Sequence, residues 1–482
     1  MHDTTKPAGQ AAACLASVFS AILEEDPLLR FEDFEERALA AGHAAMAAAL
    51  GLALERLDAR LCASLPAGQH VHDVRKRTLA TQVGDVAFTY RRVRDEHGCT
   101  VVPFADALDL PWGCRVSPAA KSFLVDAGAE VSYAKAARLM QRAGGSRVSA
   151  TCVMRALRAA GGLCAEEDAA AAEALYGQGI VPDAELEASQ ISLEVDGTWI
   201  RLQGTSEGDP KRVEVKALVA YGEKVERGRK VVRTNAVRHA CVGSPEAFWT
   251  QGMAAVGARF DLSKLERCHV GQDGEGWCSR AEEFLPGKAC VTSHLDPFHV
   301  NRAVMGCFAD PKAAWHVLDV LWDGGKEEAA RLLEACRDLG VAREKAAGRV
   351  IGYLRNNMGI IDVEGPSLGT MESENQHLYG ARMDSVPCAW SKEGASAMAR
   401  VRSRIHSKRG LPRQTRERSL SPKRAAHRER RVLESLARKG SGNVVKSVGR
   451  GYLPPHQASV SGMSAEVRFA AGLDSAMVQI RG

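Results

Sequence analysis

The sequence has no cysteine pair of the Cys-x-x-Cys type, although it contains 13 cysteines in 482 residues. An odd number of cysteines at irregular spacing is not what a disulfide framework or a cysteine-rich zinc site produces. The start of the chain lacks a basic segment followed by an apolar run, and we find no stretch close to the roughly 20 apolar residues of a membrane span. We therefore expect a protein of the reducing cytoplasm with no membrane partner.

A strong net charge is also missing, because 64 lysines and arginines nearly balance 59 aspartates and glutamates. The resulting charge of +5 and the pI near 8.5 favour a polyanionic partner only weakly over the whole chain. A length of 482 residues and 45% hydrophobic content are sufficient for roughly two to four folded units. The positions of the charges are therefore more informative than their sum.

Patterns along the chain predict a series of segments. Helical periodicity up to about residue 61 is followed by alternation around Gly84-Asp85, which predicts a β-hairpin. The expected segments are a helical N-terminal element (1–70), a basic hairpin region (71–111), a helix-turn-helix-like DNA-binding region with a linker (112–188), the first part of an α/β core (189–299), a helical insertion (300–362), the completion of the core (363–399) and a basic C-terminal tail (400–482).

The helix-turn-helix prediction depends on three short helices. Ser117-Pro118 and Ser132-Tyr133 are good helix starts, and a third helix is expected over residues 149–160 after Gly144-Gly145. Such an arrangement is typical of a DNA-binding unit whose third helix contacts bases. Many helical bundles have the same pattern, so both interpretations stay open.

The next region predicts an α/β fold with a mixed sheet. Three consecutive strands indicate an antiparallel meander, and alternating helices and strands follow it. This is the order of an RNase H-like catalytic core. The expected strands cover residues 191–202, 213–221, 230–241, 268–272 and 289–295, and the expected helices cover 245–256 and 277–285.

Three acidic residues are the candidate catalytic and metal-binding groups. Asp196 and Asp273 each follow a strand-like stretch and precede a glycine, and Glu372 lies in a helical segment after the insertion. Clustered carboxylates are the ligands that hard ions such as Mg²⁺ prefer, and two such ions can cut or join a phosphodiester. The alternative is that these acids cap turns. Glu374 competes with Glu372, because residues two apart on a helix face different sides.

Asp296 and His299 form an auxiliary pair in the motif Asp-Pro-Phe-His. Asp-Pro is a usual helix start, so a purely structural role is the first interpretation. The functional alternative is that both side chains approach the acids and orient a DNA strand or a water molecule. A zinc site that adds His269 and His294 can be drawn, but we do not favour it.

Basic residues suggest contacts with DNA phosphates in three places, namely the hairpin, the third helix and the chain after Trp390. Each group has a plain alternative as a solvated face or tail. Phosphate contacts would make binding weaken steeply with salt. The candidate DNA-binding residues are Arg75, Arg77, Arg91, Arg92, Arg155, Arg158, Arg402, Arg404, Lys408 and Arg409.

Several longer motifs resemble those of the ISLre-type (ISLre-two) bacterial insertion-sequence transposases, which are related to Mutator-like transposases. The motifs are Leu193-Glu-Val-Asp-Gly-Thr-Trp199, Leu295-Asp-Pro-Phe-His299, Tyr353-Leu-Arg-Asn-Asn357 and Leu368-Gly-Thr-Met-Glu-Ser-Glu-Asn-Gln-His377. The resemblance extends over about residues 30–410. The chain departs from it at Glu374, where many relatives carry asparagine.

The resemblance implies a DDE transposase with Asp196, Asp273 and Glu372 as its triad and with an Asp-x-x-His signature at Asp296 and His299. Such an enzyme uses Mg²⁺ or Mn²⁺, cuts double-stranded DNA at terminal inverted repeats and joins the 3′ ends to target DNA. A homodimer or larger oligomer associated with the nucleoid is implied as well. Two alternatives remain: a catalytically silent, sequence-specific DNA-binding regulator, and an RNase H-like nuclease without strand transfer.

Overall fold

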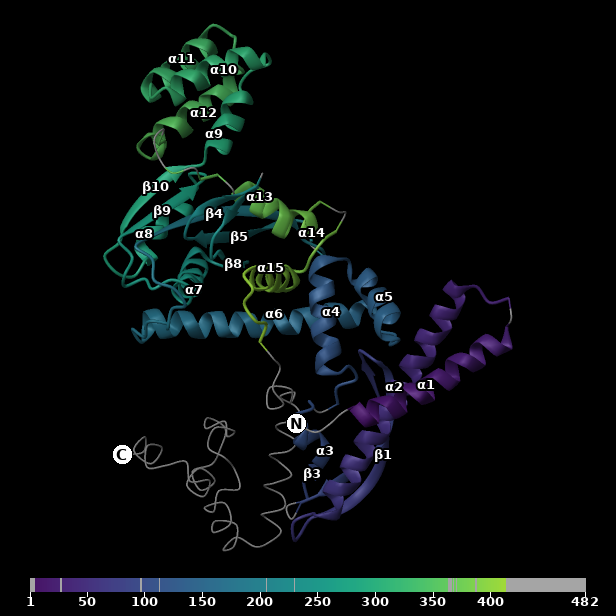
Figure 1. The fold of residues 1–482 in the computed structure, drawn as a ribbon. Coiled ribbons are helices and arrows are strands. Elements are labelled where there is room, and N and C mark those ends of the chain that lie inside the picture. The colour runs from purple at the N-terminus through teal and green to yellow at the C-terminus, as the bar shows by residue number, and fades with distance from the viewer. Residues whose placement is uncertain are drawn as a thin grey trace, which may run out of the picture. The chain divides into compact units, whose positions relative to one another are not determined.

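The computed structural model describes residues 5–412 except 27, 96–97, 112, 205, 229, 363–365, 367, 370 and 386–387. The chain forms two compact units (Figure 1). Within the described residues, the first unit contains the chain up to Phe123 and Ala137–Ser149, and the second contains Leu124–Ala136 and the chain from Ala150 onward. The predicted segment 112–188 is therefore divided between the two units.

The first unit is a helical and β-hairpin structure, as the sequence predicts. Strands β1 and β2 pair antiparallel up to Thr81 and Gly84, so the tight turn is Gln82-Val83 and Gly84 has a φ of +116°. Helix α2 packs on β2 at Gly51, where an added Cβ would lie 2.6 Å from the Ala87 carbonyl oxygen. The elements are α1 (Thr5–Glu25), α2 (Phe31–Ala63), β1 (His70–Thr81), β2 (Gly84–Arg94), β3 (Thr100–Val101) and α3 (Pro103–Ala107).

Three helices follow, as predicted, but the third is much longer than expected. They are α4 (Pro118–Glu130), α5 (Tyr133–Gly144) and α6 (Ala150–Ala172). Gly161-Gly162 does not end α6, because Gly161 lies so close to α15 (Lys392–His406) that an added Cβ would be 2.4 Å from the Ala397 Cβ. The expectation of a short recognition helix over 149–160 is therefore wrong in length, since α6 packs lengthwise on α15.

The second unit contains a mixed five-stranded sheet in the order β10-β9-β4-β5-β8. Strands β4, β5 and β8 are antiparallel, and β9 and β10 run parallel to β4. The predicted strand 230–241 is in fact two strands, because Asn235 adopts a φ of +54° between them. The strands are β4 (Gln190–Arg201), β5 (Arg212–Tyr221), β6 (Lys224–Arg227), β7 (Lys230–Arg233), β8 (Val237–Cys241), β9 (Arg267–Gln272) and β10 (Cys290–Leu295), and β6 pairs only with β7.

Helices cover both faces of this sheet. On one face, α7 (Pro245–Gly257) and α8 (Ala281–Phe284) cover alternate strand residues such as Leu193 and Val195. On the other face, Val219 and its neighbours pack on α15 and on the helical stretch 371–383. Figure 1 shows α15 between the sheet and α6. Strand alternation therefore places Asp196 on the side of stretch 371–383.

The predicted helical insertion is present and has its own apolar core. The core includes Leu318, Leu321 and Leu354, with Val300 from the first helix. The helices are α9 (Pro297–Met305), α10 (Pro311–Trp322), α11 (Lys326–Asp338) and α12 (Glu344–Asn356). The insertion begins directly after β10, since α9 starts two residues after the end of that strand.

The second unit ends in helical segments that belong to its core. Stretch 371–383 comprises α13 (Met371–Asn375), a π-helical turn (Gln376–Gly380) and α14 (Ala381–Met383). The predicted boundary at residue 400 is wrong, since it falls inside α15. The basic tail beyond residue 412 lies outside the described residues.

One helix within the described residues, α2, is long and apolar enough by length and composition to cross a membrane. The expectation that no stretch approaches a membrane span is therefore too strong. The helix nevertheless packs in the first unit through residues such as Glu55, which accepts hydrogen bonds from Thr89, and Asp58, which pairs with Arg91 at 2.8 Å.

Candidate metal and active site

The site is built around the central strand β4. Glu194 and Asp196 are two residues apart on this strand, so their side chains lie on the same face. Both are buried, with 1% and 6% of their surface exposed. Buried carboxylates require hydrogen bonds, counter-charges or a metal ion, and the two residues meet this requirement in different ways.

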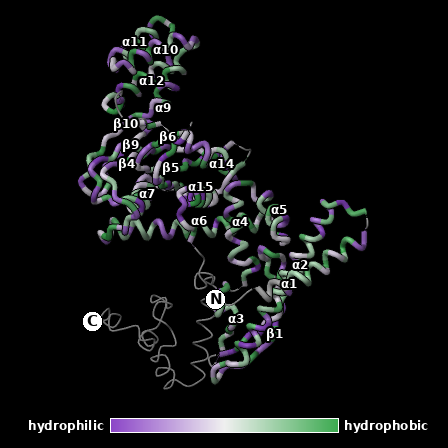
Figure 2. The backbone as a smooth tube through the Cα atoms, in the orientation of Figure 1, coloured by the Kyte–Doolittle hydropathy of each residue, from purple (hydrophilic) through white to green (hydrophobic). Residues whose placement is uncertain are grey.

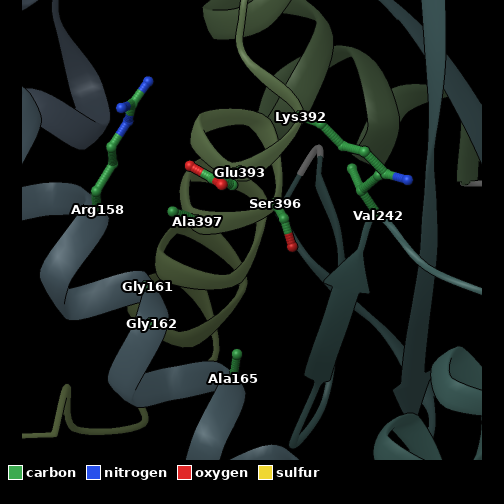
Figure 3. A pocket seen from close by; sticks show the side chains of 9 residues that line it. All are labelled: Arg158, Gly161, Gly162, Ala165, Val242, Lys392, Glu393, Ser396 and Ala397. Atoms are coloured by element: carbon green, nitrogen blue, oxygen red, sulfur yellow. The ribbon is translucent and has the colours of Figure 1, made fainter.

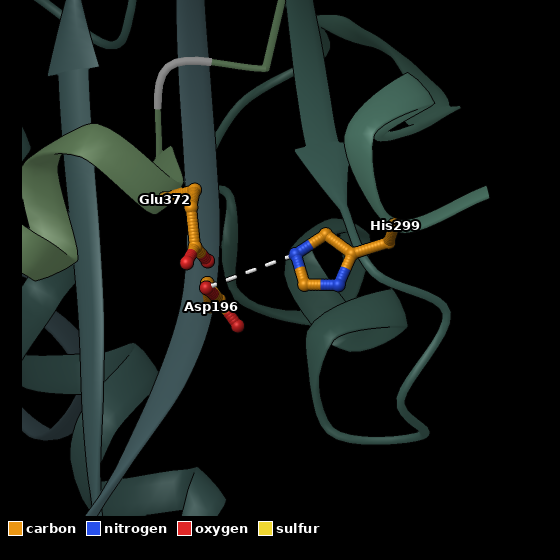
Figure 4. A group of neighbouring side chains, drawn as sticks. All are labelled: Asp196, His299 and Glu372. Atoms are coloured by element: carbon orange, nitrogen blue, oxygen red, sulfur yellow. Dashed lines mark ion pairs between the residues drawn. The ribbon is translucent and has the colours of Figure 1, made fainter. Parts of the chain in front are cut away.

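Asp196, His299 and Glu372 converge at one point. One possible ligand atom from each residue lies within 4.8 Å of the ligand atoms of the other two. Figure 4 shows the two carboxylates facing each other, with the imidazole directed at Asp196. His299 Nε2 is 4.0 Å from Asp196 Oδ2. β4, the insertion helix α9 and α13 each supply one of these residues.

Asp196 is held by two hydrogen bonds. Its Oδ1 accepts from the Gly197 amide at 2.7 Å, and its Oδ2 accepts from Asn375 Nδ2 at 2.7 Å. Burial raises the pKa of Asp196 to about 7; the charge of Asp273 raises it further, whereas His299 and the two donors oppose the shift. The effect of burial therefore exceeds the combined effect of His299 and the two donors on the pKa of this carboxyl group.

Asp273 lies near this group but outside it. Its charge acts on Asp196, yet among the described residues it is not one of those whose ligand atoms converge within 4.8 Å. Its Oδ1 accepts from the Glu275 amide at 2.9 Å, and its backbone carbonyl accepts from the Tyr353 hydroxyl at 2.9 Å. The structure thus brings together two of the three predicted acids and places the third at the margin.

The two residues of the auxiliary pair, Asp296 and His299, have different roles. Asp296 caps α9 by accepting from the Phe298 amide at 2.8 Å, as the structural interpretation predicts. This cap fixes the first turn of α9, from which His299 reaches Asp196. Burial raises the pKa of Asp296, opposed by the Phe298 amide and His299, and the acids Glu194 and Glu372 raise it further. Asp296 therefore belongs to the same electrostatic environment.

The side chains of Glu372 and Glu374 have different partners. Glu372 joins the convergent group, whereas the Glu374 carboxylate is bound by Arg233 and by Arg238, the latter at 2.7 Å. Burial alone raises the pKa of Glu374, but the two arginines lower it below its ordinary value. Glu374 is thus a buried counter-charge and leaves Glu372 as the acid that faces Asp196.

Two residues of the site escaped the sequence reasoning, Glu194 and Asn375. Glu194 Oε2 accepts from the backbone amides of Gly369 at 2.9 Å and Met371 at 3.1 Å, which places the start of α13. Its Oε1 accepts from the Tyr221 hydroxyl at 2.6 Å. The available signal was strand alternation, because an acid two residues before Asp196 shares its face, and Asn375 lies one helical turn from Glu372.

The acids and the imidazole form a donor set that fits a divalent cation. Carboxylate oxygens suit Mg²⁺ and Mn²⁺, and imidazole nitrogen is tolerated by Mn²⁺ more readily than by Mg²⁺. His299 Nε2 is buried with no hydrogen-bond partner among the described residues. A buried imidazole nitrogen beside two carboxylates is suited to act as a metal ligand.

The zinc alternative is not supported by the geometry. His269 Nδ1 is 3.1 Å from His294 Nε2, and His294 Nδ1 is 3.1 Å from Asp362 Oδ2. These residues form a chain of polar contacts. Among the described residues, no group of three metal ligands other than Asp196, His299 and Glu372 lies within 4.8 Å.

All four predicted DNA-binding arginines of the hairpin bind groups of their own unit. Arg75 and Arg92 share Asp73, whose pKa falls to about 2, chiefly because Arg92 donates to it. Arg91 pairs with Asp58, and Arg77 donates to the Cys114 carbonyl. These contacts leave one surplus positive charge at Asp73, and Arg75 is exposed.

Arg402 and Arg404 are not DNA-binding residues in this structure, which corrects the sequence-based prediction. They are 3% and 5% exposed and lie inside the second unit. Arg404 binds Asp168 and Glu167, each at 2.7 Å, and Arg402 donates to backbone carbonyls. The basic run belongs in part to a packed helix whose acidic partners lie on α6.

Three other predicted contacts remain accessible. Arg155 and Lys408 are exposed, and Arg409 is half-buried. Arg158 donates to Ser391 Oγ at 2.7 Å and borders an open cavity of about 490 Å³ (Figure 3). This cavity is lined by residues of α6, α15 and Val242, and none of the convergent metal ligands line it.

Comparison with known proteins identifies the family. A protein-family model described as "Uncharacterised protein family (UPF0236)" matches residues 25–418. Two UPF0236 proteins of Caldanaerobacter subterraneus subsp. tengcongensis are each 24% identical to this chain, over 347 and 345 residues, with 70% of this chain and 68% and 69% of the relatives covered. The chain belongs to the UPF0236 family.

Proposed function

We propose that this protein is a DDE transposase of a bacterial insertion sequence, of the ISLre type, which cuts terminal inverted repeats and joins the 3′ ends to target DNA. The single observation that carries the proposal is the convergence of Asp196 and Glu372, which are 176 positions apart in the sequence. The helical insertion between Asp273 and Glu372 supports it as well.

The strand order supports an RNase H-like core. Three antiparallel strands followed by two strands parallel to the first, with β4 central, form the arrangement that this fold requires. In it, the acid of the central strand lies between the acid that follows the parallel neighbour and the acid of a helix on one face. The positions of Asp196 on β4, Asp273 after β9 and Glu372 on α13 are compatible with this arrangement and support the proposal.

A pair of divalent cations, when bound, would hold the attacking and leaving oxygens of a phosphodiester in line and stabilise the charge that develops. Asp196, Glu372 and His299 would hold such a cation, and Asp273, whose charge acts on Asp196, would be available as a further carboxylate ligand. Asn375 and the Gly197 amide orient the Asp196 oxygens. Water would be the nucleophile for cleavage and a DNA 3′-hydroxyl for joining.

The relatives give one further point of support. A single name covers eleven loci in the genome of Caldanaerobacter subterraneus subsp. tengcongensis. Repeated loci are what an element that multiplies within a genome would leave.

The test uses the full chain and a DNA fragment that carries both flanks of its own gene. With Mg²⁺ or Mn²⁺ we expect cleavage at the element ends and joined products on a target plasmid. Asp196→Asn should abolish both reactions and leave DNA binding nearly intact, because it removes a metal ligand and no phosphate contact. Cleavage without joined products would indicate a nuclease, and specific binding without cleavage would indicate a silent regulator.

A truncation tests the role of the basic tail. The deletion must begin after residue 412, because removing residues from 400 onward would destroy α15. We expect weaker DNA binding and a flatter salt dependence, as lost phosphate contacts require. An unchanged salt slope would show that the tail is only a solvated segment.

A further inference from the structure

Helix α2 carries an apolar stripe that is exposed among the residues that the structure describes. Leu39, Met46 and Leu50 are 51%, 44% and 39% exposed. Their spacing of seven and four residues places them on one side of the helix. Green tones run through the middle of α2 in Figure 2. Exposed apolar side chains aligned in this way indicate an interaction surface.

The packed side of α2 is a different one. Ala47, Gly51 and Asp58 are the buried residues, and they face the hairpin. Helix α1 contacts α2 through Phe19 and Phe34, whose ring centroids are 6.5 Å apart. None of these residues belongs to the stripe. From Ala38 to Leu54 the sequence of α2 contains no Asp, Glu, Lys or Arg.

The stripe is complementary to itself when two copies of α2 run antiparallel with Met46 facing Met46. This register places Leu39 opposite Ala53 and Gly42 opposite Leu50, so each of the two leucines meets a small residue, and Met46 packs on its own copy at the axis. A Cβ added to Gly42 would meet nothing within 4 Å. The notch above Gly42 is therefore open to a leucine from a partner.

Charges at the two ends of the stripe select the same orientation. At one end of α2 lies Glu32, about one helical turn before Glu35. At the other end lies Arg60, about one helical turn after Leu57. In the antiparallel register Glu32 lies opposite Arg60 at both ends, whereas a parallel pair would place like charges together. Among the described residues, Glu32 has an exposed ion pair with Arg30 at 3.8 Å, and its side chain stays accessible to a partner.

We propose that the surface formed by Glu32, Leu39, Gly42, Met46, Leu50, Ala53 and Arg60 binds the same surface of a second copy of this chain in an antiparallel α2 pair. The two copies are related by a two-fold axis at Met46, as an isologous interface requires. This surface is independent of the reaction that the carboxylates perform.

The test is sedimentation equilibrium of the full chain. The wild type should show a reversible monomer–dimer equilibrium, and Met46→Lys should weaken it about tenfold or more, since it places two charges at the axis. Leu52→Lys is the matched control, because Leu52 is 57% exposed but lies off the stripe. Equal effects of the two variants, or a wild type that is monomeric throughout, would overturn the proposal.

Charge reversal tests the antiparallel register. Glu32→Arg and Arg60→Glu should each weaken dimerisation, and the double variant should restore it. Circular dichroism melting must show that all variants are folded. A double variant that is weaker than both single variants would contradict the register. Flotation with vesicles of phosphatidylglycerol and phosphatidylethanolamine that is lost in Met46→Lys, without dimerisation in solution, would assign the stripe to a membrane and overturn the proposal.

Discussion

Asn375 donates a hydrogen bond from Nδ2 to Oδ2 of Asp196 at 2.7 Å, and this bond joins the helix of the third acid to the strand of the first. The two residues are 179 positions apart. Glu372 lies one helical turn before Asn375, so the same bond fixes the direction in which Glu372 points. The hydrogen bond thus orients the carboxylates of Asp196 and Glu372 toward each other without a ligand.

The raised pKa of Asp196 predicts a specific pH dependence of stability. An unfolded aspartate titrates near 3.9, whereas burial raises the pKa of Asp196 to about 7. The folded state therefore binds this proton more tightly, and its contribution to stability is present below about pH 4 and lost as the pH rises to about 7.

Asp196→Asn removes this titration. In metal-free protein, we expect the variant to be more stable than the wild type at pH 8, by up to roughly 4 kcal/mol, and nearly equal in stability below about pH 4. Mg²⁺ or Mn²⁺ should raise the melting temperature of the wild type only. Thermal melts across this pH range check the prediction, with the exposed Asp319→Asn as a control. A constant difference between wild type and Asp196→Asn would contradict it.

Glu194 should act on metal binding through the position of α13. Glu194→Ala leaves the Gly369 and Met371 amides without their acceptor, at a cost of about 1–3 kcal/mol each. We expect a lower melting temperature and weaker Mn²⁺ binding by calorimetry. Glu194→Gln keeps one acceptor oxygen and should retain much of both properties. Unchanged Mn²⁺ affinity in a folded Glu194→Ala variant would exclude the positioning role.

Glu372→Gln should affect Mn²⁺ binding, whereas Glu374→Gln should affect the free energy of unfolding. The first removes a candidate ligand, so Mn²⁺ binding should fall while the unfolding free energy changes little. The second leaves Arg233 and Arg238 near a neutral group and should lower the unfolding free energy by several kcal/mol, as for other broken buried ion pairs. Denaturant melts and Mn²⁺ titrations on both variants provide the comparison, and identical profiles would refute the assignment.

Arg404→Ala should destabilise the protein rather than affect DNA contacts. It leaves Asp168 buried with fewer counter-charges, which costs about 3–5 kcal/mol when a buried pair is broken. The exposed neighbour Lys408→Ala should leave stability unchanged and weaken DNA binding slightly. Urea unfolding and a gel-shift assay separate the two effects. Normal stability in Arg404→Ala would restore the interpretation of a solvated basic run.

The sequence predicted the elements whose signals are local. Strand alternation located β4, β5 and β9, and helix starts located α4, α5 and α7 within a few residues. The break at Asn235 escaped prediction, since the strand composition on its two sides is continuous and only the backbone conformation separates β7 from β8. Local patterns therefore give the type of an element more reliably than its pairing.

Contacts between distant positions were not predictable in this way. Arg404 was interpreted as a tail residue, since its partner Asp168 is 236 positions away. Glu194 was overlooked, because a charged residue within an apolar strand gives no indication of the backbone amides it holds. Asp273 was placed at the correct edge of the sheet, but its side-chain direction depends on the Glu275 amide in the following turn.

The helical insertion is anchored to the site at both of its ends. His299 lies in its first helix, and Tyr353 in its last helix donates to the Asp273 carbonyl. A tilt of this insertion would displace both the His299 imidazole and the turn that carries Asp273 in one motion. A contact made far from the carboxylates, on the outer part of the insertion, would therefore change the distances within the site.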